Sequence, residues 1–193
     1  MQRIEQAQVK AVLVVQDTTS LNYSGRKNTS GLGPIGNNAD KTMGIFSHEQ
    51  LCLDARNGAA LGLLGAKRWT RDPKKFKSGP AGARNRKPIE EKENSRWLEG
   101  YQDAQRLAEA LGPTVTVTSV ADREGDIYDV FAECQRHSDS GGPHAHVLIR
   151  AHHNRALSEG ELRSHDQVKA LPVQATMTVT VERQAGRKAR TAH

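Results

Sequence analysis

The hydrophobic positions of this chain follow two spacings, one typical of strands and one typical of helices. Residues 11–16, AVLVVQ, and residues 114–121, TVTVTSVA, are β-branched runs that predict buried strands. Residues 43–55 and 59–69 predict two more strands, joined by a turn at 56–58, because Asn-Gly between such runs favours a hairpin. The runs at 11–16 and 114–121 are each followed directly by an aspartate.

Helical spacing appears in two other segments. In residues 90–111 the apolar side chains recur every three or four positions, and Gly-Pro then ends the pattern. Residues 126–136 resume this spacing, residues 146–151 predict a short strand, and residues 173–183 alternate as a half-exposed strand would. The order of strand, hairpin, helix, strand, helix and strand predicts an α/β fold whose sheet mixes antiparallel and parallel pairs.

The charge is positive and unevenly distributed. The chain has a formal net charge of +6 and a pI of about 9.5, and many of its basic residues lie between positions 67 and 92. Excess positive charge favours nucleic acid, although it also occurs in proteins that never contact DNA. Residues 70–89 predict an exposed loop that either follows a phosphate backbone or is simply solvated. No apolar run reaches the roughly 20 residues of a membrane span, so we expect no membrane partner.

Asp17 and Asp122, the residues that follow the two apolar runs, are the candidates for chemistry. If the two strands are neighbours, the two carboxylates converge, and carboxylates held close together repel unless a cation lies between them. Mg²⁺ prefers oxygen ligands and often uses one or two protein carboxylates together with phosphate and water. The alternative is local: Asp122 caps the helix that begins near Gly125, and Asp17 holds a turn.

Several other residues invite a functional interpretation. His144, His146, His152 and His153 fit no zinc spacing, and the two cysteines, which are far apart, are interpreted as reduced thiols. Trp69 and Trp97 are expected to be packing residues rather than platforms for bases. Arg150, at the end of a predicted strand, is a candidate phosphate contact.

Three segments carry a resemblance to a known family. Residues 15–23, VQDTTSLNY, resemble the first catalytic motif of insertion-sequence transposases of the IS-four/Tn-five type. Residues 122–128, DREGDIY, resemble their second motif, and residues 91–98, EKENSRWL, resemble the helix that lies between the two motifs. The order and the intervals also agree, and the likeness extends from about residue 10 to residue 155.

The resemblance implies a ribonuclease-H-like mixed sheet with flanking helices, followed by the start of a β-rich insertion. Residues 1–155 would form an incomplete catalytic core, and residues 156–193 the beginning of a truncated insertion. Asp17 and Asp122 would be the first two of three acids that bind two Mg²⁺ or Mn²⁺ ions. The third motif of the family, Tyr-x2-Arg-x3-Glu-x6-Lys, is absent from the sequence.

The resemblance also implies partners and a location. The family cuts and joins transposon-end DNA by metal-dependent phosphoryl transfer, so double-stranded DNA is the expected partner, and a homodimer or a full-length transposase is a possible second one. The expected location is the bacterial cytoplasm, at the nucleoid. The candidate DNA contacts are Lys67, Arg68, Arg71, Lys74, Lys75 and Arg150. With two of three acids, we expect the chain alone to be inactive. The alternatives are a non-catalytic DNA-binding or inhibitory remnant and a degenerate product without a stable fold.

Overall fold

The chain folds into two compact units, residues 1–152 and residues 153–193. The sequence predicts this boundary at residue 155. The structure is a computed structural model, and it describes residues 2–26, 28–36, 42–73, 88–89, 92–157, 162–181 and 190–192. Among these residues no helix combines the length and the apolar character that a membrane crossing requires.

The first unit is built around a six-stranded sheet. Its strands are β1 (Ala11–Asn22), β2 (Gly33–Pro34), β3 (Met43–Asp54), β4 (Ala60–Trp69), β5 (Thr116–Ala121) and β6 (Ala145–Ile149). Its helices are α1 (Gln2–Gln6), α3 (Ser95–Leu111) and α4 (Tyr128–Asp139), and a 3-10 turn covers Arg123–Gly125. The predicted hairpin is confirmed, since β3 and β4 pair across a loop that contains Asn57 and Gly58.

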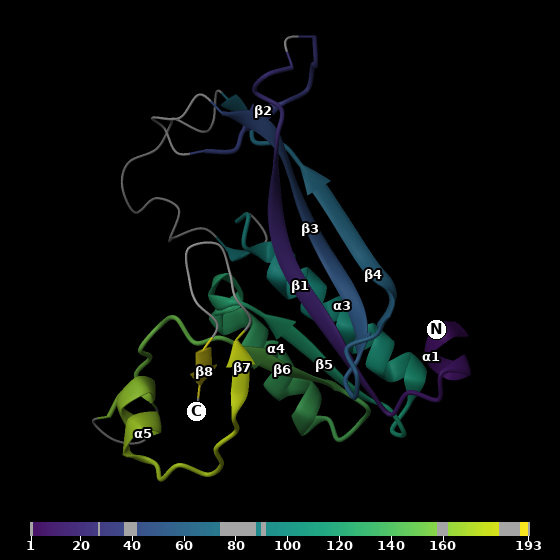
Figure 1. Cartoon of the computed structure of the whole chain (residues 1–193), viewed down its shortest axis with the longest axis vertical. Coiled ribbons are helices and arrows are strands. Elements are labelled where there is room, and N and C mark those ends of the chain that lie inside the picture. The colour runs from purple at the N-terminus through teal and green to yellow at the C-terminus, as the bar shows by residue number, and fades with distance from the viewer. Residues whose placement is uncertain are drawn as a thin grey trace. The chain divides into compact units, whose positions relative to one another are not determined.

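The sheet mixes antiparallel and parallel pairs. Strand β3 runs antiparallel to both of its long neighbours, β1 and β4, whereas β5 runs parallel to β1 and β6 parallel to β5. The short β2 pairs with the start of β3. Figure 1 shows the three long strands side by side, with α3 packed along them. The predicted α/β fold with a mixed sheet is confirmed.

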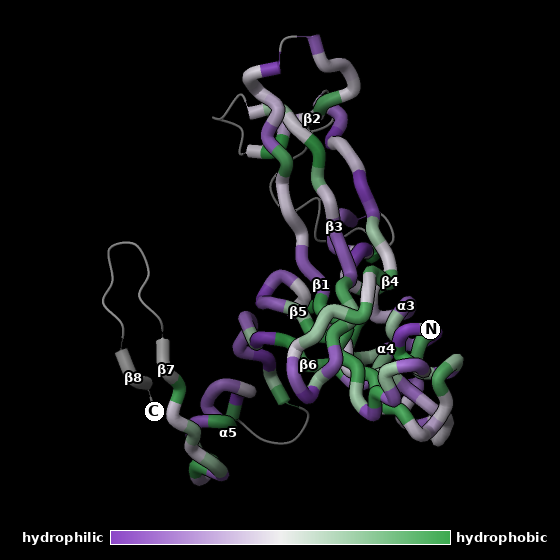
Figure 2. Tube along the Cα trace, turned by 45° about the vertical axis from the view of Figure 1, so that its right-hand side comes forward, coloured by the Kyte–Doolittle hydropathy of each residue, from purple (hydrophilic) through white to green (hydrophobic). Residues whose placement is uncertain are grey.

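One face of the sheet is buried against α3. Val12 and Val14 of β1 and Val117 of β5 are fully buried there, next to Trp97 and Tyr101 of the helix. These strand residues alternate with less buried ones, as period-2 side-chain placement requires. Helix α4 lies next to α3, and in Figure 2 the hydrophobic segments of the strands gather beside these two helices.

The second unit contains α5 (Ser164–Ala170) and an antiparallel pair formed by β7 (Val179–Val181) and β8 (Arg190–Ala192). The alternating pattern predicts a strand over residues 173–183. The structure has regular strand only at Val179–Val181 within the described part of this segment, and residues 172–178 are irregular. Alternation alone therefore overestimates the strand, because a segment also needs a hydrogen-bonded neighbour to be one.

Candidate functional site

The register of three adjacent strands places Asp17, Asp122 and Arg150 in one row. Val15 pairs with Val120 in the parallel β1–β5 ladder, so Asp17 and Asp122 lie two residues beyond the same pair. The Arg150 N–H donates to the carbonyl oxygen of Ala121 at 3.2 Å, which places Arg150 next to Asp122. Neighbouring strands are about 4.8 Å apart, and residues in register project to the same face. We call this the acid face, the face that carries Asp17 and Asp122.

The sequence predicts that Asp17 lies at the tip of its strand, and this prediction is wrong. Strand β1 continues to Asn22, and Asp17 pairs with Glu49 of the antiparallel β3. It is the parallel ladder that stops, because β5 ends at Ala121, one residue before Asp122. The polar residues after Asp17 would not fit a buried strand. This part of β1 is largely exposed and has only β3 as an antiparallel neighbour, so it can contain Thr18, Thr19 and Ser20. The site thus forms where a parallel strand ends beside one that continues.

Each aspartate uses one oxygen in a local hydrogen bond. Asp17 Oδ1 accepts from the Thr18 N–H at 2.8 Å, and Asp122 Oδ1 accepts from the Glu124 N–H at 2.8 Å. Asp122 therefore does have a local capping role, but it caps the 3-10 turn at Arg123–Gly125 and not a helix that begins near Gly125, since α4 begins at Tyr128. Both side chains are exposed, and within the described residues the second oxygen of each accepts no hydrogen bond. One oxygen of each carboxylate is thus available to a ligand.

A chain of polar side chains lies on the opposite face, behind the two acids. Arg96 Nε donates to Thr18 Oγ1 at 2.9 Å, and Thr18 Oγ1 lies 2.9 Å from His48 Nδ1. His48 Nε2 lies 3.2 Å from Gln16 Oε1, and Gln16 Nε2 donates to Ser119 Oγ at 2.7 Å. These contacts join α3, β1, β3 and β5. A polar network this deeply buried is stable only when its members satisfy each other's hydrogen bonds.

The protonation state of His48 determines which groups of this network donate and which accept. Burial lowers the pKa of His48 to about 4, and the Arg96 guanidinium adds to this effect, while Asp17 opposes it. The imidazole is therefore neutral at pH 7. With the hydrogen bonds as placed, the Thr18 hydroxyl donates to Nδ1, and Nε2–H donates to the Gln16 carbonyl oxygen. Every hydrogen bond in the chain then has one donor and one acceptor.

Gly100 of α3 provides a test of this packing. A Cβ added at Gly100 would lie 2.1 Å from Gln16 Oε1, the oxygen that accepts from His48. We expect Gly100→Ala to displace the Gln16 amide and to lower the free energy of unfolding by about 1–3 kcal/mol. Chemical denaturation followed by circular dichroism measures this. The reverse change at an exposed position of the same helix, Ala110→Gly, measures the difference in helix propensity between alanine and glycine without any steric contact.

Two arginines lie on the acid face, one in β4 and one directly after β6. Arg68 of β4 pairs with Ser47, two residues from Glu49, so its side chain is on the same face as Asp17. Its Nη2 lies 3.9 Å from a carboxylate oxygen of Glu49, and it remains 63% exposed. Arg150 follows β6 at the other side of the pair and is also exposed. Arg150 is thus in line with Asp122, whereas Glu49, the direct strand partner of Asp17, lies between Asp17 and Arg68.

The other predicted DNA contacts are placed differently. Lys67 directly precedes Arg68 in β4, so its side chain projects to the opposite face of the sheet. There its Nζ lies 2.5 Å from Glu99 Oε2 of α3. Arg71 makes a two-pronged ion pair with Glu93, at 2.6 Å for both contacts, and its guanidinium lies 4.3 Å from the centre of the Phe46 ring. Lys74 and Lys75 lie outside the described residues. The acid face thus receives Arg68 and Arg150 but not Lys67.

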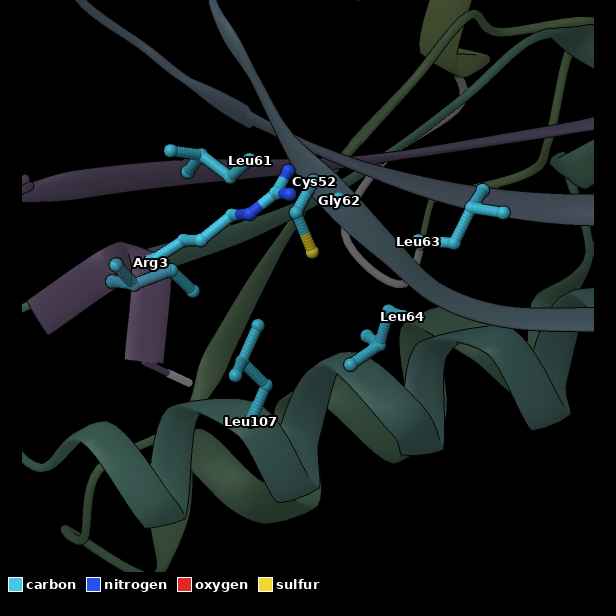
Figure 3. Close-up of a pocket in the computed structure, with 8 residues that line it drawn as sticks. Arg3, Cys52, Leu61, Gly62, Leu63, Leu64 and Leu107 are labelled. Carbon is cyan, nitrogen blue, oxygen red and sulfur yellow. The ribbon is translucent and has the colours of Figure 1, made fainter.

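A pocket of about 220 Å³ lies elsewhere in the first unit and offers no comparable chemistry (Figure 3). Leucines of β4 and α3 line much of it, together with Cys52 and Arg3. Burial raises the pKa of the Cys52 thiol, which keeps it protonated and poorly nucleophilic. In the described part of the chain, no three His, Cys, Asp or Glu side chains group as a complete metal site would require. The four histidines from His144 to His153 therefore form no such site there.

The residues behind the acids are the part that the sequence predictions missed. His48 and Gln16 sit at alternate positions of strands, where the pattern indicates burial but not a polar partner. Arg96 lies in a segment that the sequence predicts as helical and that belongs to the resemblance at residues 91–98, but neither pattern gives the arginine a partner. Comparison with models of known protein families finds none that matches the chain. The site consists of two exposed carboxylates just beyond the last pair of a parallel ladder, with Arg150 in the next strand position.

Proposed function

We propose that this chain belongs to the catalytic domain of a DNA transposase and that Asp17 and Asp122 together hold divalent metal ions. The row formed by Asp17, Asp122 and Arg150 carries this proposal. A cation between the two carboxylates relieves their repulsion, and a guanidinium beside them favours a phosphate. The substrate class that these groups fit is therefore a phosphodiester.

The fold supports the same proposal. Three long antiparallel strands and the short β2 are followed by two strands that extend the sheet in parallel, each reached through a helix. This arrangement is compatible with a ribonuclease-H-like fold, which the motifs around Asp17 and Asp122 imply. In open α/β sheets, ligand sites gather at the carboxyl ends of parallel strands. Asp122 lies at that end of β5, and Arg150 lies at that end of β6.

The donor set fits a hard cation such as Mg²⁺ or Mn²⁺. Each aspartate offers an exposed carboxylate with one oxygen that no described residue occupies. Such ions use few protein carboxylates and complete their shells with water and substrate phosphate. When bound, they stabilise charge on the attacking and leaving oxygens of a phosphodiester. The residues of the chain do the rest: Asp17 and Asp122 fix the position of the ions, and Arg150 orients the phosphate.

Substitution of either aspartate by asparagine tests the proposal. Asparagine keeps the size and the oxygen that accepts from Thr18 or Glu124, but it removes the charge. We expect Asp17→Asn and Asp122→Asn each to weaken Mn²⁺ binding by at least about 10-fold, measured by electron paramagnetic resonance of free Mn²⁺. Asp139→Asn, at an exposed carboxylate at the end of α4, is the matched control and should bind like the wild type. Equal Mn²⁺ binding by the wild type and both site variants would refute the metal site.

A non-catalytic DNA-binding remnant is the second candidate. Two observations favour it: Arg68 and Arg150 both lie on the acid face, and within the described residues no third carboxylate completes a metal group. This candidate predicts that DNA binding falls with salt, because phosphate contacts release counterions. It also predicts no metal-dependent nicking by the purified chain and no effect of Asp122→Asn on the gel shift. Nicking that Asp122→Asn abolishes would exclude it.

A further inference from the structure

Arg96 connects the two candidate acids from the back of the sheet. Asp17 Oδ1 accepts from the Thr18 N–H, and Thr18 Oγ1 accepts from Arg96 Nε at 2.9 Å. Arg96 Nη2 donates to Glu124 Oε2 at 3.1 Å, and the Glu124 N–H donates to Asp122 Oδ1. The side chain of Arg96 thus binds the two residues whose N–H groups hold the acids.

We infer that Arg96 is a positioning residue that sets the separation and orientation of Asp17 and Asp122. The inference rests on the proposed function, because the distance between the acids matters only if they share a ligand. Asp17 and Asp122 come from separate segments, and the β1–β5 ladder stops before it reaches them. Beyond the last backbone pair, the bridge through Arg96 joins the segment of Asp17 to the turn of Asp122.

The guanidinium is held in one orientation. Its third contact is Nη1, which donates to the Glu93 carbonyl oxygen at 2.6 Å. The rings of Trp69 and Trp97 lie on it, each with its centre 5.5 Å from the guanidinium carbon. Arg96 is 8% exposed, while Glu124, its ion-pair partner, is 62% exposed at the side chain. A rigid planar fork with several donors can serve three acceptors at once, whereas a lysine ammonium at the same place is a single flexible point charge.

A simpler account is that Arg96 only stabilises the fold. That account predicts a loss of stability and nothing specific to the acids. The positioning role predicts in addition that the geometry of the guanidinium, and not its charge, controls metal affinity. Arg96→Lys separates the two, because it keeps the positive charge near the site and removes the fork.

The test is Mn²⁺ binding by the full chain carrying Arg96→Lys. We expect binding to weaken by about 10-fold or more, the effect usual for residues that orient metal ligands. Arg106→Lys is the control, since it makes the same change on the same helix at an arginine that pairs with Asp103 and is 67% exposed. It should bind Mn²⁺ like the wild type. Wild-type affinity in a folded Arg96→Lys protein would overturn the inference and leave the proposed function intact.

Glu124→Gln provides a second variant that the fold should tolerate, because the side chain is exposed. Loss of the Glu124 charge would change the affinity for a nearby cation even without the bridge. Glu124→Gln is therefore combined with Arg96→Lys in a double-mutant cycle, which isolates the coupling between the two residues. We expect Arg96→Lys to cost less Mn²⁺ affinity in the Glu124→Gln background than in the wild type. Strictly additive effects would overturn the bridge through Glu124.

Hydrogen exchange of the Thr18 and Glu124 amides is a readout that needs no metal. These amides donate to Asp17 and Asp122, and we expect both to exchange faster in Arg96→Lys than in Arg106→Lys. Unchanged exchange would overturn the inference. If exchange changes but the wild type binds no Mn²⁺, the proposed metal site fails, and the positioning role fails with it. Weaker Mn²⁺ binding and faster exchange together support both proposals.

Discussion

Replacing Trp97 by alanine should lower the free energy of unfolding by about 3–5 kcal/mol, the cost of removing a large buried aromatic side chain. Trp97 is 1% exposed, and its ring meets the His48 ring edge-on with centroids 4.7 Å apart. It also supports the turn after Asp122. A Cβ added at Gly125 would lie 3.2 Å from Trp97 Cε3 and 2.6 Å from the Ala121 Cβ, so the turn lies directly on the indole. The cavity left by alanine would therefore open beneath Asp122.

Trp69→Ala is the control for this prediction. Trp69 stacks on Phe46 with ring centroids 5.3 Å apart and is only partly buried. We expect it to cost about 1–2 kcal/mol. Trp97→Phe should also be milder than alanine, because it keeps an aromatic ring and removes an indole N–H that is buried without a hydrogen-bond partner. Urea denaturation of the three variants gives the comparison, and equal losses for Trp97→Ala and Trp69→Ala would contradict it.

The elements of the fold were predictable from the sequence because each has a local cause. Valines and threonines at alternate positions predicted β5, and apolar residues three and four apart predicted α3. The two acids were predictable as candidates because each follows such a run directly. The order of elements then limits the sheet to a mixed one, which the structure has.

The contacts within the site were not predictable in the same way. That Asp17 and Asp122 are in register depends on which residues of β1 and β5 pair, and a shift of one residue would turn one of them to the other face. The hydrophobic pattern of each strand does not show which residue of the other strand it pairs with. The two side chains that Arg96 joins, Thr18 and Glu124, are 78 and 28 residues away in the chain, so no local spacing indicates them. The sequence predicted the acids but not the residues behind them.

The same network explains why an arginine and a histidine lie side by side in the core. A charged His48 next to Arg96 would place two positive charges in a buried site. Because the imidazole is neutral, it can accept from Thr18 and donate to Gln16, so the positive charge stays on Arg96. Burial lowers the pKa of Arg96, while Glu124 and Glu93 oppose this, and the guanidinium remains protonated at neutral pH.

Acidification should therefore destabilise the protein through His48. Its pKa is about 4 in the folded chain and 6.5 as the ordinary value, so between these pH values the unfolded chain binds more protons. A group whose folded pKa is depressed contributes stability above its unfolded pKa and loses it as the pH falls towards the folded one. The difference between the two pKa values corresponds to a loss of about 3 kcal/mol between pH 6.5 and pH 4.

His48→Gln isolates this contribution, because glutamine donates and accepts hydrogen bonds but does not titrate. The free energy of unfolding, obtained from urea denaturation at pH values from 7 to 4, should fall less steeply with acidification in this variant than in the wild type. His146→Gln makes the same change at an exposed position of β6 and should keep the wild-type slope. If His48→Gln keeps that slope as well, the acid sensitivity comes from other groups. If only His48→Gln loses it, a neutral imidazole behind the two acids is part of what keeps this fold stable.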